Sequence, residues 1–288
     1  MAADDRLAWT IVLTSVCVVP ATPLLVPRLC GGAGALPELR GRVLAAVGAM
    51  AAGADAWFVV GAGEAGDGLP QDGVSRYPAE PSTGSFVGFG VDVRVTLDGR
   101  AGEERDADDH RNPSAGAREE VCAGGAQPGS APAASMALPL LIAGWLRGGL
   151  ARDLRPRRPV TGMRVGREAP WEVCVESGRA LRRDIDARPE RIGVLVIGDG
   201  PSTLTAKAPG AFDERARPLA EEVAAAMADG DAAALIRLEP RQCARVGLDV
   251  RSALQVAAGL VGDDRVRVDH QSVQWPYGVA YYTGLWSV

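Results

Sequence analysis

The sequence predicts an α/β fold with a mixed, largely parallel central sheet and helices on both faces. Short β-branched and apolar runs alternate along the chain with longer segments of helical periodicity. Several of the short runs are apolar throughout, as strands are when helices cover both faces of a sheet. A domain has about 100–200 residues, so 288 residues allow one large domain or two small ones. Because no linker divides the chain, we expect a single α/β domain, 1–288.

The first third predicts a β-α-β unit. Residues 10–19 are a β-branched run of strand length, residues 36–53 repeat apolar side chains at helical spacing, and residues 56–60 form a second buried run. A connection of helix length implies that the two strands form a parallel pair. The Gly- and Pro-rich residues 61–85 predict a loop, and the alternating valines within residues 86–97 predict a strand.

The middle of the chain contains its least regular stretch. Residues 98–132 gather acids, Gly, Pro and Ser, and they predict a long or flexible loop. Residues 135–150 are apolar almost all round and predict a buried helix. Residues 160–165 predict a short strand, and residues 168–187 predict an amphipathic helix that Pro189 ends.

The last third continues the alternation of strands and helices. Residues 191–197 predict another buried strand. Four helices and then two strands are expected after it: 212–228, 231–238, 240–246 and 250–261, then 265–269 and 278–286.

Charge and composition narrow the classes of partner. A net charge of −5 argues against broad nucleic-acid binding, which needs a basic face for the phosphates. Residues 7–27 carry no charge and are long enough to span a bilayer, but Pro20, Pro23 and Pro27 would break such a helix. We therefore expect neither a membrane anchor nor a signal peptide. Five cysteines without a CxxC motif predict free thiols in a reducing cytoplasm.

Histidine is scarce, and this limits metal chemistry, because imidazole is the commonest ligand for zinc and non-haem iron. The chain has two histidines, His110 and His270. His110 lies in an acidic run whose spacing matches no known metal loop, so a solvated surface is expected there. His270 follows the predicted strand 265–269, which is a good place for chemistry in an α/β sheet, although a hydrogen-bonded structural histidine also fits.

Glycine-rich turns follow two of the predicted strands. Gly61, Gly63 and Gly66 spell G-x-G-x-x-G, but residues 67–70 will not start the helix that a dinucleotide site requires. A loop at the carboxyl end of a strand explains these glycines better.

The second turn, Gly198-Asp199-Gly200-Pro201-Ser202-Thr203, follows the buried strand 191–197. Its glycines would let backbone amides face a ligand, and Asp199 could act as a base or ligand, or could simply cap the turn. Lys207 could contact an anionic ligand or be an ordinary surface lysine.

Taken together, motifs along nearly the whole chain resemble one family. They are Cys17-Val-Val-Pro20-Ala21-Thr22-Pro23, Gly88-Phe-Gly90-Val-Asp92-Val, Ala137-Leu-Pro139-Leu, Gly198-Asp199-Gly200, Lys207-Ala-Pro209-Gly210 and Pro276-Tyr277-Gly278-Val279-Ala280-Tyr281. As a set they are similar to actinobacterial class III extradiol ring-cleavage dioxygenase-like proteins of the B-subunit type, in the superfamily that includes Memo-like proteins.

The resemblance implies a pocket at the strand ends. In the active dioxygenases this pocket holds Fe(II) through two histidines and one glutamate, for a catecholic substrate and O₂. One family histidine lies in a Pro-His-Pro-Pro-type motif, where this chain has Ala21. The other would follow the strand at Val59 and Val60, where this chain has Gly61 and Gly63. We therefore expect a metal-free homologue without a cofactor, one that binds a small aromatic or anionic ligand or is non-catalytic.

Two alternatives stay open. One is an active Fe(II) dioxygenase with displaced ligands, and the other is a non-catalytic partner in a homo- or hetero-oligomer. The aromatic residues Trp275, Tyr277, Tyr281 and Tyr282 could serve such an interface or pack in the core. The predicted pocket residues are Ala21, Gly61, Gly63, Asp199, Ser202, Lys207, His270 and Tyr277.

Overall fold

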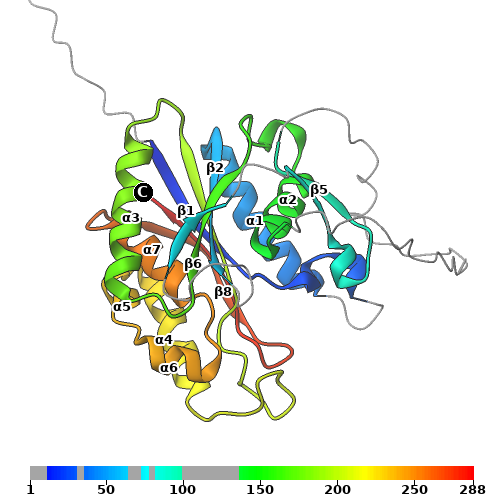
Figure 1. The fold of residues 1–288 in the computed structure, drawn as a ribbon, viewed down its shortest axis with the longest axis vertical. Coiled ribbons are helices and arrows are strands. Elements are labelled where there is room, and N and C mark those ends of the chain that lie inside the picture. The colour runs from blue at the N-terminus through cyan, green and yellow to red at the C-terminus, as the bar shows by residue number, and fades with distance from the viewer. Residues whose placement is uncertain (1–11, 31–35, 64–72, 78–81, 99–135) are drawn as a thin grey trace, which may run out of the picture.

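A computed structural model describes residues 12–30, 36–63, 73–77, 82–98 and 136–288. These residues form a seven-stranded sheet in the order β3-β6-β2-β7-β1-β9-β8, with helices on both faces (Figure 1). Its strands are β1 (Leu13–Val19), β2 (Ala56–Gly63), β3 (Val74–Arg76), β6 (Thr161–Gly166), β7 (Ile192–Ile197), β8 (Arg267–Gln274) and β9 (Tyr281–Ser287).

The core of the sheet is parallel. Strands β6, β2, β7 and β1 run in one direction, whereas β3 and β9 pair antiparallel at the two sides and β8 pairs antiparallel with β9. The prediction of a mixed, largely parallel sheet with helices on both faces is confirmed. The predicted pairing of the first two strands is corrected, because β7 lies between β1 and β2.

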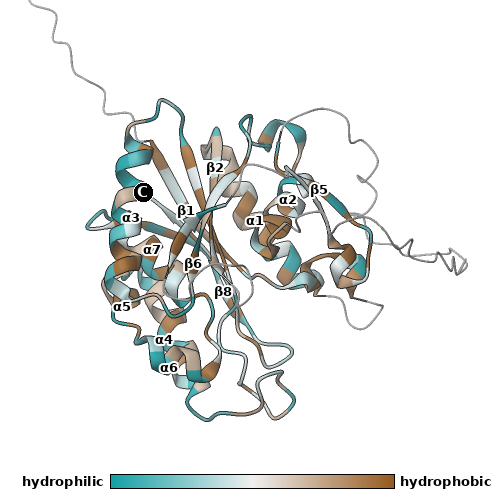
Figure 2. Ribbon diagram, viewed as in Figure 1, coloured by the Kyte–Doolittle hydropathy of each residue, from teal (hydrophilic) through white to brown (hydrophobic). Residues whose placement is uncertain are grey.

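Helices cover the two faces unequally (Figure 1). Five helices lie on one face: α3 (Trp171–Asp186), α4 (Ala216–Asp229), α5 (Ala232–Ile236), α6 (Pro240–Val246) and α7 (Arg251–Val261). The other face carries α1 (Pro37–Gly53) and α2 (Leu138–Gly149). Each face of the sheet has its own hydrophobic core, and neighbouring residues of β2 point into different ones. Phe58 belongs to the core on the side of α3 and α7, whereas Trp57 belongs to the core on the side of α1 and α2. Figure 2 shows the apolar residues that gather along the strands and helices.

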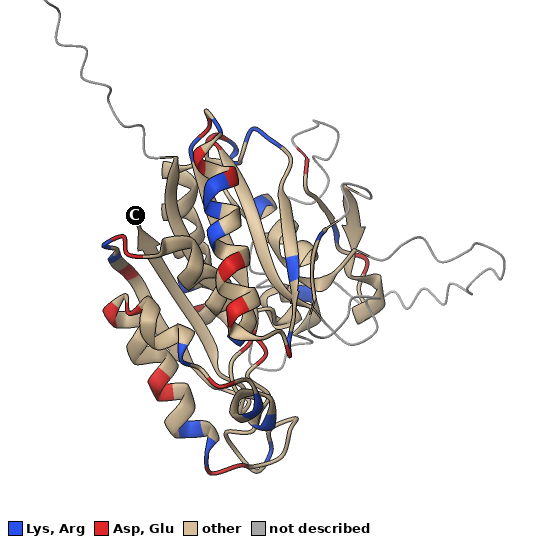
Figure 3. Cartoon of the chain, turned by 60° about the vertical axis from the view of Figure 1, so that its left-hand side comes forward, with Lys and Arg blue, Asp and Glu red and all other residues tan. Residues whose placement is uncertain are grey.

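Helices α3 and α7 pack unusually closely through two glycines. A Cβ atom on Gly178 of α3 would lie 2.6 Å from the backbone nitrogen of Leu260, and one on Gly259 of α7 would lie 2.8 Å from the Cα of Val175. The outer face of α3 carries acidic and basic side chains in alternation (Figure 3), including the pairs Arg182–Asp186 and Arg183–Glu176. This helix is thus amphipathic, as the sequence predicts.

The predicted strand 86–97 is wrong in its first half. Residues Phe86–Phe89 form a short 3-10 helix, and only β5 (Arg94–Thr96) is a strand, paired with β4 (Thr83–Ser85). The hydroxyl of Ser85 accepts the N–H of Val87, and Gly90 ends the turn at φ +97°. Local capping therefore prevails over the apolar pattern.

Several element boundaries also differ from the sequence prediction. Strand β2 continues through Gly63, and β3 and β4 lie inside the predicted loop 61–85. Helix α4 starts at Ala216, because the carboxylate of Asp213 accepts the N–H of Arg215 at 2.9 Å and holds the preceding residues in a turn. Residues 99–132 of the predicted loop lie outside the described residues, as does His110.

The apolar segment 12–27 folds as β1 followed by two short 3-10 helices, Pro23–Leu25 and Pro27–Leu29. Each of these two helices begins at a proline, and the prolines end the strand as expected. Among the described residues, none of the helices has the length and apolar character needed to cross a membrane.

Candidate functional site

The carboxyl ends of the parallel strands meet at the lower edge of the sheet in Figure 1, which we call the carboxyl edge. In the ladder between β2 and β7, Gly61 pairs with Ile197, so Gly63 and Asp199 lie two residues farther along each chain. The backbone N–H of Ala21, just after β1, donates a 2.8 Å hydrogen bond to Oδ1 of Asp199. Three of the predicted pocket residues therefore follow or end neighbouring strands here.

The turn that carries Asp199 is held by backbone hydrogen bonds to three other segments. The N–H of Gly198 donates to the carbonyl of Val19 at 3.2 Å, and that of Gly200 donates to the carbonyl of Ala280 at 2.8 Å. The carbonyl of Asp199 accepts the N–H of Val250, where α7 begins, at 3.0 Å. Asp199 thus has a fixed position. Its carboxylate binds the turn that follows β1, not the turn after β7 in which Asp199 itself lies.

A tyrosine beside Asp199 adds a buried hydroxyl to the carboxyl edge. Tyr281, the first residue of β9, forms a side-chain hydrogen bond with Thr22. Burial raises the pKa of Tyr281 to about 12, the charge of Asp199 acts in the same direction, and the Thr22 hydrogen bond opposes them. The phenol therefore stays neutral at physiological pH and can donate a hydrogen bond.

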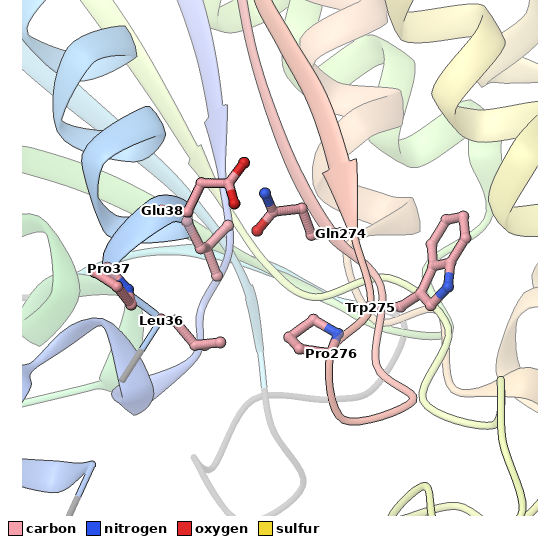
Figure 4. Close-up of a pocket in the computed structure, with 7 residues that line it drawn as sticks. Leu36, Pro37, Glu38, Gln274, Trp275 and Pro276 are labelled. Carbon is pink, nitrogen blue, oxygen red and sulfur yellow. The ribbon is translucent and has the colours of Figure 1, made fainter. Parts of the chain in front are cut away.

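A cavity of about 500 Å³ lies between the first turn of α1 and the end of β8 (Figure 4). It is lined by Leu36, Pro37, Glu38, Leu39, Gln274, Trp275 and Pro276. Gln274 is the ladder partner of Tyr281, so the cavity begins one strand away from the Tyr281–Thr22 pair. Asp199, Thr22, Tyr281 and Gln274 thus follow one another across β7, β1, β9 and β8; we call this set the polar row.

A second cavity, of about 310 Å³, lies at the opposite, amino edge of the sheet, and its charged side chains are largely engaged in ion pairs. Its apolar floor is buried, and rim groups of opposite charge pair with each other, as Arg158 does with Glu190 at 3.0 Å. Asp184, also on its rim, pairs with Arg76 at 2.6 Å. The cavity beside the polar row is therefore the better candidate for a ligand.

The remaining predicted pocket residues have mostly structural roles. Gly61 lies within β2, where a Cβ atom would be 2.5 Å from the hydroxyl of Tyr77 and 2.7 Å from Pro139. Ser202 is half-buried and its N–H donates to the carbonyl of Val246 at 2.9 Å, whereas Lys207 is exposed. Gly61 and Gly63 belong to a strand, not to a phosphate-binding turn.

His270 does not lie at a strand end, which corrects the sequence prediction. It is exposed in the middle of β8, on the side strand of the sheet, at φ +55°. The β8–β9 ladder is irregular between Asp269 and Ser272, and β8 then continues to Gln274. The prediction ended the strand at the bulge because polar residues interrupt the apolar pattern there. His270 is therefore separated from the polar row along its own strand.

Tyr277 lies near the polar row, in the tight turn between β8 and β9. The N–H of Gly278 donates to the carbonyl of Trp275 at 3.2 Å, and Gly278 adopts φ +75°. The ring of Tyr277 is 43 % exposed, and its charge when ionised would add to the raised pKa of Tyr281. The structure thus places Tyr277 beside Tyr281 and toward solvent.

The sequence did not single out Thr22, Gln274 or Glu38, and it treated Tyr281 as a core or interface residue. Thr22 is hidden in the Pro-rich turn, and Gln274 lies beyond the predicted end of its strand. Glu38 carries only the ordinary signature of an acid in the first turn of a helix. Their common location depends on strand order, which local patterns do not give.

The donor groups at the carboxyl edge do not fit the iron that the resemblance implies. Ala21 and Gly63 have no side-chain atom that could coordinate a metal. Oδ1 of Asp199 already accepts a hydrogen bond from the N–H of Ala21. Within the described ranges, no three His, Cys, Asp or Glu side chains gather as a metal site would require.

Comparison with known proteins adds no assignment to this geometry. No family model matches the chain, and no curated protein matches it.

Proposed function

We propose that this protein is a metal-free relative of the class III extradiol dioxygenase-like proteins that binds a small organic molecule at its carboxyl edge. The observation that carries the proposal is the contact between cavity and polar row. Gln274 lines the cavity and pairs in the sheet with Tyr281, whose hydroxyl bonds to Thr22. A ligand in the cavity would therefore contact Gln274 and lie one strand away from the Tyr281–Thr22 pair.

General properties of α/β proteins support this placement. Ligands of open α/β sheets bind outside the carboxyl ends of the strands. A volume of about 500 Å³ is within the usual range of roughly 300–1,000 Å³ for small-molecule pockets. The lining is mainly apolar, with one carboxylate and one carboxamide, which is the usual balance in such pockets.

The side chains favour a small aromatic ligand over an anionic one. Leu36 and Pro276 offer apolar surface, whereas the carboxylate of Glu38 would repel an anion. The ring of Trp275 points away from Glu38 and Gln274 (Figure 4), so this residue borders the cavity mainly through its backbone. The exposed Lys207, which the sequence analysis considered as a contact for an anionic ligand, does not line the cavity.

A ligand screen by protein NMR tests the proposal. Small aromatic compounds with hydroxyl, amide or amine groups would be titrated while the resonances of Leu36, Leu39 and Trp275 are followed. We expect at least one class to shift these resonances, and Gln274→Ala to weaken its binding several-fold. Asp55→Asn, which changes a carboxylate at the amino edge, is the control and should leave binding unchanged. Shifts spread evenly over the surface, or none with any class, would contradict the proposal.

Metal analysis separates this proposal from a working dioxygenase with displaced ligands. Protein purified without chelators should hold far less than one equivalent of Fe, Mn or Zn, and added Fe(II) should not support ring opening of a catechol panel. Stoichiometric bound metal, or a yellow ring-cleavage product that depends on Fe(II), would favour the dioxygenase instead.

A further inference from the structure

We propose that the cavity between α1 and β8 selects a primary amine that carries an apolar body, and that its ammonium group binds between Glu38 and Gln274. The inference rests on the proposed function, because it names the ligand class of the same cavity. It is carried by the two polar side chains of the lining, which project toward one another from opposite walls (Figure 4).

Glu38 presents one carboxylate oxygen to the cavity. Both hydrogen bonds from Arg42, at 3.2 Å from Nε and 2.8 Å from Nη2, go to Oε1 of Glu38. Within the part of the chain that the structure describes, Oε2 has no hydrogen-bond partner. Arg42 thus restricts the rotation of the Glu38 side chain while it leaves an acceptor for a ligand.

Gln274 supplies the second acceptor. Its carboxamide makes no hydrogen bond to another described residue, and its oxygen can turn toward the cavity. An ammonium group has three donors, so it can bind Glu38, Gln274 and water at once. A hydroxyl has a single donor, and a carboxylate has none and would face the charge of Glu38.

Arg42 offsets part of the charge of Glu38, and two further positive features near the cavity do not reverse this preference. The N-terminus of α1 carries a partial positive charge that would attract an anion. Glu38 is already in that first turn and supplies the negative charge there. The guanidinium of Arg217 lies 5.4 Å from the centre of the Trp275 ring, so this ring already contacts a cation.

The apolar residues of the lining define the rest of the ligand. Leu36 and Pro276 offer aliphatic surface beside the two polar groups, and the ring of Trp275 points away from them (Figure 4). A short chain that ends in a phenyl ring matches this surface and a cavity of about 500 Å³.

Three probes of similar shape and different charge test the inference: 2-phenylethylamine, 2-phenylethanol and 3-phenylpropanoate, titrated at neutral pH by calorimetry and NMR. We expect the amine to bind at least tenfold more tightly than the alcohol, and the carboxylate to bind most weakly. Glu38→Gln should weaken the amine at least tenfold and leave the alcohol unchanged. Glu172→Gln removes an acid from the first turn of α3, outside the cavity, and should change neither.

The outcomes distinguish the two proposals. Equal binding of amine and alcohol, or an amine affinity that Glu38→Gln does not change, would overturn the inference. If a neutral or anionic aromatic shifts the cavity resonances and the amine does not, the inference fails and the proposed function stands. If neither these probes nor the wider aromatic screen shifts them, both fail.

Discussion

The backbone N–H of Ala21 donates a 2.8 Å hydrogen bond to the carboxylate of Asp199, which ties the segment after β1 to the segment after β7. The amino edge of the sheet has a counterpart. There the carboxylate of Asp55 accepts the N–H of Arg191 at 3.3 Å and also binds its guanidinium. Both carboxylates thus join backbone segments at the ends of strands, but the Asp199–Ala21 hydrogen bond is part-buried and the Asp55–Arg191 hydrogen bond is exposed.

Asp199→Ala should lower the free energy of unfolding by about 1–3 kcal/mol, because it leaves the N–H of Ala21 without its acceptor in a part-buried place. Asp199→Asn keeps a side-chain oxygen and should cost less. Urea unfolding measures both. The control Asp55→Ala removes an exposed ion pair and should cost about 1 kcal/mol or less. Equal losses for Asp199→Ala and Asp55→Ala would contradict the structural role of the Ala21 contact.

Gly178→Ala and Gly259→Ala should each destabilise the fold by several kcal/mol. A methyl group at either position would overlap the backbone of the facing helix, and backbone atoms cannot rotate away as a flexible side chain can. Gly41→Ala in α1 is the matched control, since a Cβ there meets no atom within 4 Å and alanine favours the helix by about 1 kcal/mol. Thermal unfolding should show the Gly41 variant at or above the parent. Tolerance of alanine at Gly178 and Gly259 would mean that α3 and α7 pack less closely.

Much of the fold was predictable because burial leaves a local pattern. The apolar run of β7 and the amphipathic spacing of α3 identify both elements without knowledge of their neighbours. The place of β7 between β1 and β2 was not predictable, since periodicity does not encode which strands pair. The second half of β8 was missed because its polar residues and the irregularity at His270 conceal a strand at the side of the sheet.

The candidate site was predictable where a polar side chain directly follows a recognisable strand. Asp199 is flanked by glycines directly after a buried strand, which is a local signal. Tyr281 has no such signal, because its partner Thr22 lies in the turn after the first strand and reaches it only through the pairing of β1 with β9. Glu38 and Gln274 likewise meet only once α1 packs beside β8.

Arg251 should be among the least replaceable residues outside the site. It is 1 % exposed at the start of α7, and its guanidinium donates to the carbonyls of Arg167 and Ala169 and, at 2.7 Å, to Oε1 of Gln255. Arg251→Met removes these donors and leaves buried acceptors unpaired, so we expect a loss of about 3 kcal/mol. Arg188→Met, at an exposed position, should stay within about 0.5 kcal/mol. Urea unfolding of the two variants compares them directly, and similar losses would contradict the role of Arg251.

The free energy of unfolding should decline at alkaline pH, because two thiols and a phenol have higher pKa values in the folded chain than in the unfolded one. Burial raises the pKa of Cys174 to about 11 and those of Cys243 and Tyr281 to about 12. The corresponding stability is present in full below the unfolded pKa values of 9.0 for the thiols and 10.0 for tyrosine. As the pH rises through the folded values it is lost, at about 1.4 kcal/mol per pH unit for each group that ionises only in the unfolded chain.

Urea unfolding between pH 8 and pH 11 measures this decline. Tyr281→Phe should reduce the slope above pH 10 and leave the slope between pH 9 and pH 10 unchanged, because the thiols dominate that interval. Phe212→Leu, at an exposed position that carries no ionisable group, is the control and should not alter the slope. A free energy of unfolding that stays constant up to pH 11 would show that these groups ionise in the folded chain, and hence that the hydroxyl of Tyr281 is not held neutral beside Asp199.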